Sequence, residues 1–324
     1  LFPDKLALEQ ASSEITAKYK ASLVKGKCMA DLTGGLGIDS YYFSKNFQQL
    51  HYVETDLLRY EKAMHNFSAL GATNIELHQN TAEDFLQIAP KLDFVFLDPD
   101  RRSKNKKLVQ IEDCSPNFLQ LKEEIFSKTE KVMLKYSPML DISLALTKIS
   151  DVEQVHVVSV DNECKEILLL LKKNFALEPQ IIAIDLKDEQ EFKLQFYLSE
   201  EASANAKVGV PEKYIYEPNA AIRKAGAFKL TAQKYGLKKL HPSTHLYTSD
   251  GLINSFPGRI FSVQKEANPK QLKGQKLNII SRNFPLKPAE IKKKYKLQDG
   301  GNQFLIATTL KDKRKVFLLC EKTL

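Results

Sequence analysis

Acidic and small polar residues follow short apolar segments at four places in the first hundred residues. They are Asp31, Glu54, the pair Asn80 and Thr81, and Asp98. Carboxylate and amide oxygens accept hydrogen bonds, and a carboxylate also attracts a cation. The carboxyl ends of parallel strands meet at one edge of a sheet, where such folds bind their ligands. We therefore expect these side chains to line one pocket.

A glycine-rich loop follows the first of these segments. Gly34, Gly35 and Gly37 fall within four positions, shortly after Asp31. Glycine suits a backbone with positive φ or the close approach of a ligand, and a helix N-terminus attracts anions. A dinucleotide-binding loop would have a third glycine at position 40, where this chain has Ser40. Asp31 would repel a pyrophosphate and instead suits a ligand with an ammonium group.

S-adenosylmethionine is such a ligand, because it combines an amino acid end, a ribose and an adenine. It requires an acid near the first loop, an acid near the ribose and a polar contact at the adenine. Asp31, then Glu54, then Asn80 or Thr81 follow the first three apolar segments in that order. Glu54 lies 17 residues after Gly37, which suits a ribose acid in either kind of nucleotide-binding fold.

Strands and helices are expected to alternate at short intervals in the first two thirds of the chain. The apolar segments predict strands at 28–30, 50–53, 75–77, 94–97, 132–134, 155–160, 181–186 and 192–198. Helical spacing and stop signals predict helices at 4–23, 38–43, 57–70, 83–89, 115–128 and 163–173. This alternation is typical of an α/β fold with a doubly wound, mostly parallel sheet.

The pattern changes after a weakly patterned stretch at 202–210, which we interpret as a linker. Beyond it we expect a helix at 217–235, loops at 241–249 and 257–259, a strand at 277–281, a helix at 288–295, and strands at 304–310 and 316–320. We therefore predict an N-terminal helical segment at 1–24, a Rossmann-like domain at 25–201, a small segment at 211–264 and a basic domain at 265–324.

The net charge of +8 is unevenly distributed along the chain. Counted from the sequence, residues 1–210 carry a net charge of −7, residues 211–264 carry +5 and residues 265–324 carry +10. A mildly acidic front part joined to a basic tail is typical of a catalytic domain with a module that binds a polyanion.

Several classes of protein are disfavoured. The four cysteines form no CxxC pair, so we expect no zinc site, no disulfide framework and a cytoplasmic location. The six histidines are scattered, and no carboxylate–histidine spacing indicates a metal. The longest apolar run, 167–171, is too short to span a membrane.

From Cys28 to Leu198 the chain resembles a class I S-adenosylmethionine-dependent methyltransferase. The segment Asp31–Gly37 is similar to the first motif of that family, Glu54 to its ribose-binding acid, and residues 80–85 to the segment beside adenine. Residues 98–101, Asp-Pro-Asp-Arg, stand where many nucleic-acid methyltransferases carry an Asp-Pro-Pro-aromatic motif.

The C-terminal part is similar to a bacterial group of these enzymes with a THUMP-like C-terminal domain and a small ferredoxin-like segment before it. The resemblance rests on Glu217–Arg223, Arg282–Leu286 and Gly300-Gly301. It implies that 211–264 is ferredoxin-like and 265–324 is THUMP-like, both being small α+β units. THUMP domains are associated with RNA modification, so the resemblance implies that the partner is RNA.

The resemblance and the positions of the residues together predict the site. The predicted cofactor-binding residues are Asp31, Thr33, Gly34, Gly35, Gly37, Asp39, Glu54, Thr55, Asn80, Thr81 and Ala82. The predicted catalytic residues are Asp98, Pro99, Asp100 and Arg101. The predicted substrate-binding residues are Arg101, Arg102, Lys104, Lys106, Lys107, Lys135, Lys292, Lys293 and Lys294. No metal-binding residue is predicted.

The fourth-strand motif departs from the family pattern, because Asp100 replaces the second proline and Arg101 the aromatic residue. Asp98 can still orient an amine, Asp100 could act as a second acceptor or general base, and Arg101 could stack on a base or hold a phosphate. The first hypothesis is a methyltransferase that acts on RNA (tRNA or rRNA) at a base nitrogen. The second is an RNA-binding protein that keeps the cofactor fold without methyl transfer, and the third, disfavoured by Asp31, is a dinucleotide-dependent oxidoreductase.

Overall fold

The computed structural model describes residues 11–101, 111–187 and 190–323. The chain divides into two compact units. The first comprises Leu1–Ile182 and Leu186–Glu189, and the second comprises Ala183–Asp185 and Gln190–Leu324. In the described part of the chain, no helix is both long enough and apolar enough to cross a membrane.

The largest sheet has nine strands in the order β11-β10-β8-β9-β7-β4-β1-β2-β3. Its strands are β1 (Gly26–Asp31), β2 (Phe47–Val53), β3 (Ile75–His78), β4 (Phe94–Leu97), β7 (Lys131–Tyr136), β8 (Val152–Val160), β9 (Glu163–Lys172), β10 (Gln180–Lys187) and β11 (Gln190–Phe196). β1, β2, β3, β4 and β7 pair in parallel, whereas β9 is antiparallel to both β7 and β8. The chain turns back at β1, since β2 and β3 lie on one side of β1 and β4 lies on the other. Such a reversal is where a doubly wound sheet binds its ligands.

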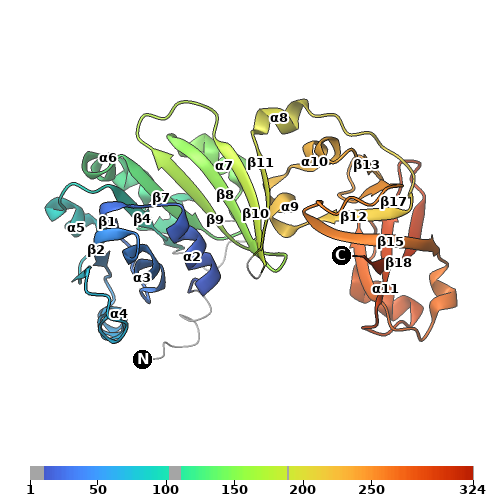
Figure 1. Ribbon diagram of the computed structural model, residues 1–324, viewed down its shortest axis with the longest axis horizontal. Helices are drawn as coiled ribbons and strands as arrows, with labels where there is room; N and C mark the ends of the chain where they lie inside the picture. The colour runs from blue at the N-terminus through green and yellow to red at the C-terminus, as the bar shows by residue number, and fades with distance from the viewer. Residues whose placement is uncertain (1–10, 102–110, 188–189, 324) are drawn as a thin grey trace. The chain divides into compact units, whose positions relative to one another are not determined.

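Helices cover both faces of the parallel strands (Figure 1). In Figure 1, α2 (Glu14–Ser22), α3 (Ile38–Ser44) and α4 (Leu57–Ala69) lie on one side of the strands, and α5 (Ala82–Ile88), α6 (Phe118–Lys128) and α7 (Ile142–Lys148) lie on the other. A short pair, β5 (Asp100–Arg101) and β6 (Cys114–Ser115), follows β4 and is antiparallel, with the 3₁₀ turn η1 (Ile111–Asp113) before β6. The predicted α/β, Rossmann-like, doubly wound sheet is thus confirmed, and α2 matches the described part of the predicted N-terminal helix.

The helix predicted at 163–173 is wrong, because this segment is β9. Its apolar run, Ile167-Leu168-Leu169-Leu170-Leu171, has neither the alternation of a half-exposed strand nor the spacing of an amphipathic helix. The structure explains the run: β9 lies between β7 and β8, and Ile167, Leu168 and Leu169 are fully buried. A central strand covered on both faces requires continuous apolar sequence.

The second unit contains a seven-stranded sheet in the order β13-β14-β12-β15-β18-β17-β16. Its strands are β12 (Tyr214–Pro218), β13 (Lys238–Lys239), β14 (Tyr247–Ser249), β15 (Gly258–Glu266), β16 (Asn278–Arg282), β17 (Gln303–Thr309) and β18 (Lys315–Lys322). Its helices are α8 (Leu198–Ser203), α9 (Ala220–Ala225), α10 (Phe228–Lys234), the 3₁₀ turn η2 (Pro269–Leu272) and α11 (Pro288–Tyr295). β16 and β17 pair in parallel, and the other strand pairs of this sheet are antiparallel.

The single helix predicted at 217–235 is also wrong. β12 continues to Pro218, and Gly226 then separates α9 from α10. Asn219 caps α9 by accepting a hydrogen bond from the amide of Ile222, and Gly226 closes α9 with φ +81°. The loops predicted at 241–249 and 257–259 partly form strands, β14 and the start of β15. The helix predicted at 288–295 and the strands near 277–281, 304–310 and 316–320 are confirmed as α11, β16, β17 and β18.

Candidate functional site

The glycine-rich loop between β1 and α3 is folded tightly against β2. The amide of Gly34 donates to the carbonyl of Val53 (2.8 Å), and the hydroxyl of Tyr52 donates to the carbonyl of Gly35 (2.7 Å). A Cβ on Gly34 would lie 2.2 Å from the ring of Tyr52, so no larger residue fits there. Gly37 has φ +79° at the start of α3, a backbone conformation that glycine adopts without strain.

Asp31 lies at the end of β1 and is almost fully buried. One carboxylate oxygen accepts from the amide of Thr33 (3.1 Å) and the other from the hydroxyl of Ser40 (2.5 Å). Burial raises the pKa of Asp31 to about 7, although these two hydrogen bonds act against the rise. Asp31 therefore holds both ends of the loop in place and titrates close to neutral pH.

Glu54 lies one residue after β2, at the other side of the same loop. Its two oxygens accept from the amides of Gly35 (2.8 Å) and Asp56 (2.8 Å). A carboxylate has about four lone-pair positions. The hydroxyl of Thr55 also donates to one of these oxygens (3.3 Å). Glu54 therefore has about one lone pair left to accept a hydrogen bond from a hydroxyl group of a ligand.

These elements enclose a cavity of about 350 Å³ at the carboxyl ends of β1, β2 and β4. Most of the predicted cofactor-binding residues line it: Asp31, Thr33, Gly34, Gly35, Asp39, Glu54, Thr55, Thr81 and Ala82. Asp98 and Asp100 line it as well, whereas Gly37, Asn80 and Pro99 do not. Sequence reasoning missed Ser12, Arg59 and Ser115, which are also lining residues.

Asp98 stands at the rim of this cavity, with 36% of its side chain exposed. Its amide donates to the hydroxyl of Thr33 (2.7 Å), so the fourth strand and the glycine-rich loop are directly joined. Its carboxylate contacts the ammonium group of Lys135 on β7. Burial acts to lower the pKa of Lys135, but the carboxylates of Asp98, Asp39 and Glu166 outweigh burial and raise it. Lys135 thus remains charged and holds the side chain of Asp98.

A buried charge network adjoins the cavity and was not predicted from the sequence. Lys20 of α2 is fully buried, and its ammonium group donates to both carboxylate oxygens of Glu166 on β9 (2.9 and 2.8 Å). The same ammonium group lies 3.2 Å from Asp39, which also accepts from the hydroxyl of Ser12 (2.7 Å). Because Lys20 and Glu166 are 146 positions apart, nothing in their local sequence indicates the pair.

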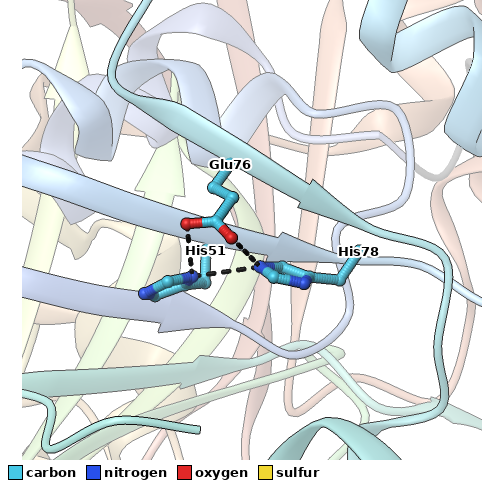
Figure 2. Close-up of side chains that lie close together, drawn as sticks. All are labelled: His51, Glu76 and His78. Carbon is cyan, nitrogen blue, oxygen red and sulfur yellow. Dashed lines mark hydrogen bonds and ion pairs between the residues drawn. The ribbon is translucent and has the colours of Figure 1, made fainter. Parts of the chain in front are cut away.

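Two histidines that look scattered in the sequence come together on neighbouring strands (Figure 2). Nδ1 of His51 on β2 lies 3.0 Å from Nε2 of His78 on β3, and each nitrogen lies 3.5 Å from the carboxylate of Glu76. Burial lowers the pKa of both rings, which favours the neutral form that binds metals. The three side chains could therefore hold a metal ion. A direct hydrogen bond between the rings also accounts for their closeness, and the absence of a metal stays a prediction.

The predicted substrate-binding residues are described only in part. Arg102, Lys104, Lys106, Lys107 and the side chain of Arg101 lie outside the described residues. On α11, Lys292 contacts Asp299, and Lys293 and Lys294 are exposed. Their roles, like that of Lys135, stay predictions.

Comparisons with known proteins cover both units of the chain. Residues 214–257 match a family model described as a ferredoxin-like domain, and residues 258–322 match one described as THUMP domain-like. A crystal structure of a "putative methyltransferase" from Porphyromonas gingivalis W83 is 34% identical, with a TM-score of 0.91, and the match covers all of this chain and 84% of that chain.

Two proteins from Mycobacterium tuberculosis strains CDC 1551 and H37Rv are also similar. Both are named uncharacterized S-adenosylmethionine-dependent methyltransferases, and each is 22% identical over 260 residues. The match covers 80% of this chain and 68% of each relative.

Proposed function

Because the chain belongs to the family of the Porphyromonas gingivalis protein, as a class I S-adenosylmethionine-dependent methyltransferase with a THUMP-like C-terminal domain, we propose that it methylates RNA at a base nitrogen. The proposal concerns the substrate and the roles of individual residues. The observation that carries it is a carboxylate, Asp98, at the rim of the cavity in a chain that also has a strongly basic THUMP-like region.

The cavity fits the cofactor of this family. Ribose hydroxyls are donors, and Glu54 presents a carboxylate with an unused lone pair. The amino group of the methionine part is a cation, and Asp31 and Asp39 line the cavity beside the loop. The tight contact between Gly34 and Tyr52 keeps the wall at the loop free of side chains. When bound, S-adenosylmethionine supplies an activated methyl group on its sulfonium sulfur.

Asp98 is proposed to position the nitrogen that is methylated. Its carboxylate accepts a hydrogen bond from an exocyclic amine, which orients the nitrogen lone pair toward the methyl carbon. The nitrogen–carbon bond forms as the carbon–sulfur bond breaks, and the nitrogen then releases a proton to a carboxylate or to water. Lys135 is proposed to hold Asp98 in this orientation through their direct contact.

RNA is proposed as the substrate because of the charge of the second unit. Residues 265–324, which lie almost wholly within the THUMP-like match, carry a net charge of +10, whereas residues 1–210 carry −7. A surface of this kind attracts phosphate backbones irrespective of sequence. The exposed lysines of α11, Lys293 and Lys294, are proposed to contribute to this attraction.

Methyl incorporation into total RNA from cells that lack the gene tests the proposal. We expect incorporation with the wild-type protein and a loss of at least a hundredfold with Asp98→Ala, because general acid–base and positioning groups contribute factors of about 10² to 10⁴. Calorimetry with S-adenosylhomocysteine should show that Asp98→Ala keeps its affinity for the cofactor product.

Asp141→Ala is a control, since Asp141 caps α7 outside the cavity lining. Mass spectrometry of the nucleosides would identify the methylated base. Incorporation into DNA or protein but not into RNA would contradict the proposed substrate, and full activity of Asp98→Ala would contradict the proposed role of Asp98.

A further inference from the structure

One buried carboxylate in the second unit is surrounded by three arginines. Glu217, in β12, has a fully buried side chain. Arg259 donates through Nε to one of its oxygens (2.8 Å), and Arg223 and Arg282 lie at 3.1 and 2.6 Å from the other. We call these four residues the arginine cluster.

The fold brings the cluster together from separate elements. Glu217 and Arg259 are opposite each other on β12 and β15, Arg223 lies on α9, and Arg282 is the last residue of β16. Gly258 makes the approach of β15 possible, since a Cβ there would lie 2.1 Å from the carbonyl oxygen of Glu217. Glu217 and Arg223 belong to the ferredoxin-like match, and Arg259 and Arg282 belong to the THUMP-like match.

The charges of the cluster do not balance. One carboxylate faces three guanidinium groups, which leaves a net charge of +2, or +1 when the buried Asp185, which also acts on Arg223, is included. Burial lowers the pKa of Arg223, and the charges of Arg282 and Arg259 lower it further, whereas the carboxylate of Glu217 raises it. A salt bridge that served stability alone would need one arginine, because burying surplus charge is costly. The surplus would be relieved by a bound anion.

The cluster also presents its cations to solvent. The side chains of Arg223, Arg259 and Arg282 are 25%, 32% and 34% exposed, whereas that of Glu217 is 0% exposed. A guanidinium group has five N–H donors arranged in a rigid fork. Glu217 takes up some of these donors from the buried side and fixes the orientation of the groups. Nη1 of Arg282 also donates to the carbonyl of Ser281 (3.0 Å). The donors that are not used in these contacts are available to a ligand on the exposed side.

Unsatisfied polar atoms lie on the residues next to the cluster. Asn219 is 98% buried, and in the described part of the chain its Nδ2 has no hydrogen-bond partner. The buried hydroxyl of Thr308, opposite Arg282 on β17, likewise has no partner among the described residues. Buried polar groups are nearly always hydrogen-bonded, so each unsatisfied group requires an explanation. Both atoms are shielded from solvent, so the exposed guanidinium groups, and not these atoms, are what a ligand can reach.

We propose that the arginine cluster binds a phosphate group of the RNA, with Glu217 holding the three guanidinium groups in position. This proposal rests on the RNA substrate proposed above. Phosphate suits several guanidinium forks better than a planar carboxylate does, because it offers oxygens in more than one plane. The site lies outside the methyl-transfer cavity and is composed of second-unit residues. It contributes affinity and positions the RNA without reading its sequence.

The test compares arginine-to-glutamine variants of the full chain for binding to fluorescently labelled bulk tRNA over a range of salt concentrations. Arg282→Gln and Arg223→Gln should each weaken binding roughly tenfold and lower the slope of log affinity against log salt by about one. Arg314→Gln is the matched control, because Arg314 is exposed and pairs with Asp312 on a turn of the same unit. It should change the affinity and the slope far less.

Arg282→Lys is the second test variant, to be used if Arg282→Gln does not fold, because lysine keeps a positive charge beside Glu217. It should unfold at nearly the wild-type temperature and still lose affinity, since lysine lacks the planar fork. Equal tRNA binding by Arg282→Lys and the wild type would overturn the inference.

Two further results would also overturn it. One is that the cluster variants bind tRNA with the same affinity and salt slope as Arg314→Gln does. The proposal that RNA is the substrate would then still stand. The other is stabilisation of the wild type by inorganic phosphate while the cluster variants bind tRNA normally, which would show a site for a small anion only. Failure of the RNA substrate itself would instead appear as absent methyl incorporation into RNA by the wild type.

Discussion

Replacing Asp31 with asparagine should change cofactor affinity and protein stability in opposite directions. The pKa of Asp31 rises from 3.8 to about 7 in the folded protein, chiefly through burial. A shift of about 3 units corresponds to roughly 4 kcal/mol, at 1.36 kcal/mol per unit. This is the upper limit of the free energy that the folded protein loses when Asp31 ionises.

The sign follows from proton binding. Between about pH 4 and pH 7 the folded protein retains a proton on Asp31 that the unfolded chain has released, so the free energy of unfolding falls as the pH rises. Asp31→Asn has no charge to bury and should be more stable than the wild type at pH 8, by up to about 4 kcal/mol. Its advantage should vanish near pH 4. Urea unfolding at both pH values measures the difference.

Cofactor affinity should behave in the opposite way. If the ionised form of Asp31 attracts the amino group of the ligand, the affinity for S-adenosylhomocysteine should rise about tenfold between pH 6 and pH 8 as the carboxyl group ionises. Asp31→Asn should bind more weakly at pH 8 and lose this pH dependence.

Calorimetry at several pH values measures the affinities. Asp141→Asn is the control, because asparagine caps a helix as well as aspartate does. An Asp31→Asn protein with the wild-type pH profile, or with lower stability than the wild type at pH 8, would refute the reasoning.

Two other predictions concern the supports of the cavity. Lys20→Met should lower the free energy of unfolding by about 3–5 kcal/mol, because Glu166 and Asp39 would lose their buried cation. Lys18→Met should change it little, since Lys18 forms an exposed pair with Glu14. Equal urea midpoints for the two variants would disprove this prediction. Gly34→Ala should abolish measurable binding of S-adenosylhomocysteine, because the added Cβ would collide with Tyr52. Gly251 has open space around it, so Gly251→Ala should bind normally in the same calorimetric assay. Normal binding by Gly34→Ala would contradict the packing argument.

The sequence allowed the sheet and the cofactor loop to be predicted because their signals are local. Asp31, three glycines and a helix start fall within a dozen residues, and the acids at the following strand ends repeat the pattern. The continuous apolar run of β9 could not be assigned, since a buried strand and a buried helix have the same composition over five residues.

Contacts between distant residues could not be predicted at all. Lys20 and Glu166 read as ordinary surface charges until β9 is placed in the sheet beside α2. The same holds for Glu217 and Arg282, which look like members of a solvated, basic C-terminal region. A signal was available for Arg259, because it follows Gly258, and a glycine within a strand often marks a close backbone approach.

The arginine cluster has a consequence for how the second unit can be divided. The two family matches meet between residues 257 and 258, yet Glu217 on one side depends on Arg259 and Arg282 on the other. A shared apolar core crosses the same point, with Ile215 and Leu246 packed in one cluster with Phe261 and Ile306. The predicted boundary between 264 and 265 falls within β15. A junction between 257 and 258 would separate Glu217 from Arg259 and Arg282, and one between 264 and 265 would separate it from Arg282. Either junction would also divide the shared apolar core, so the two matched regions should be exchanged between relatives only together.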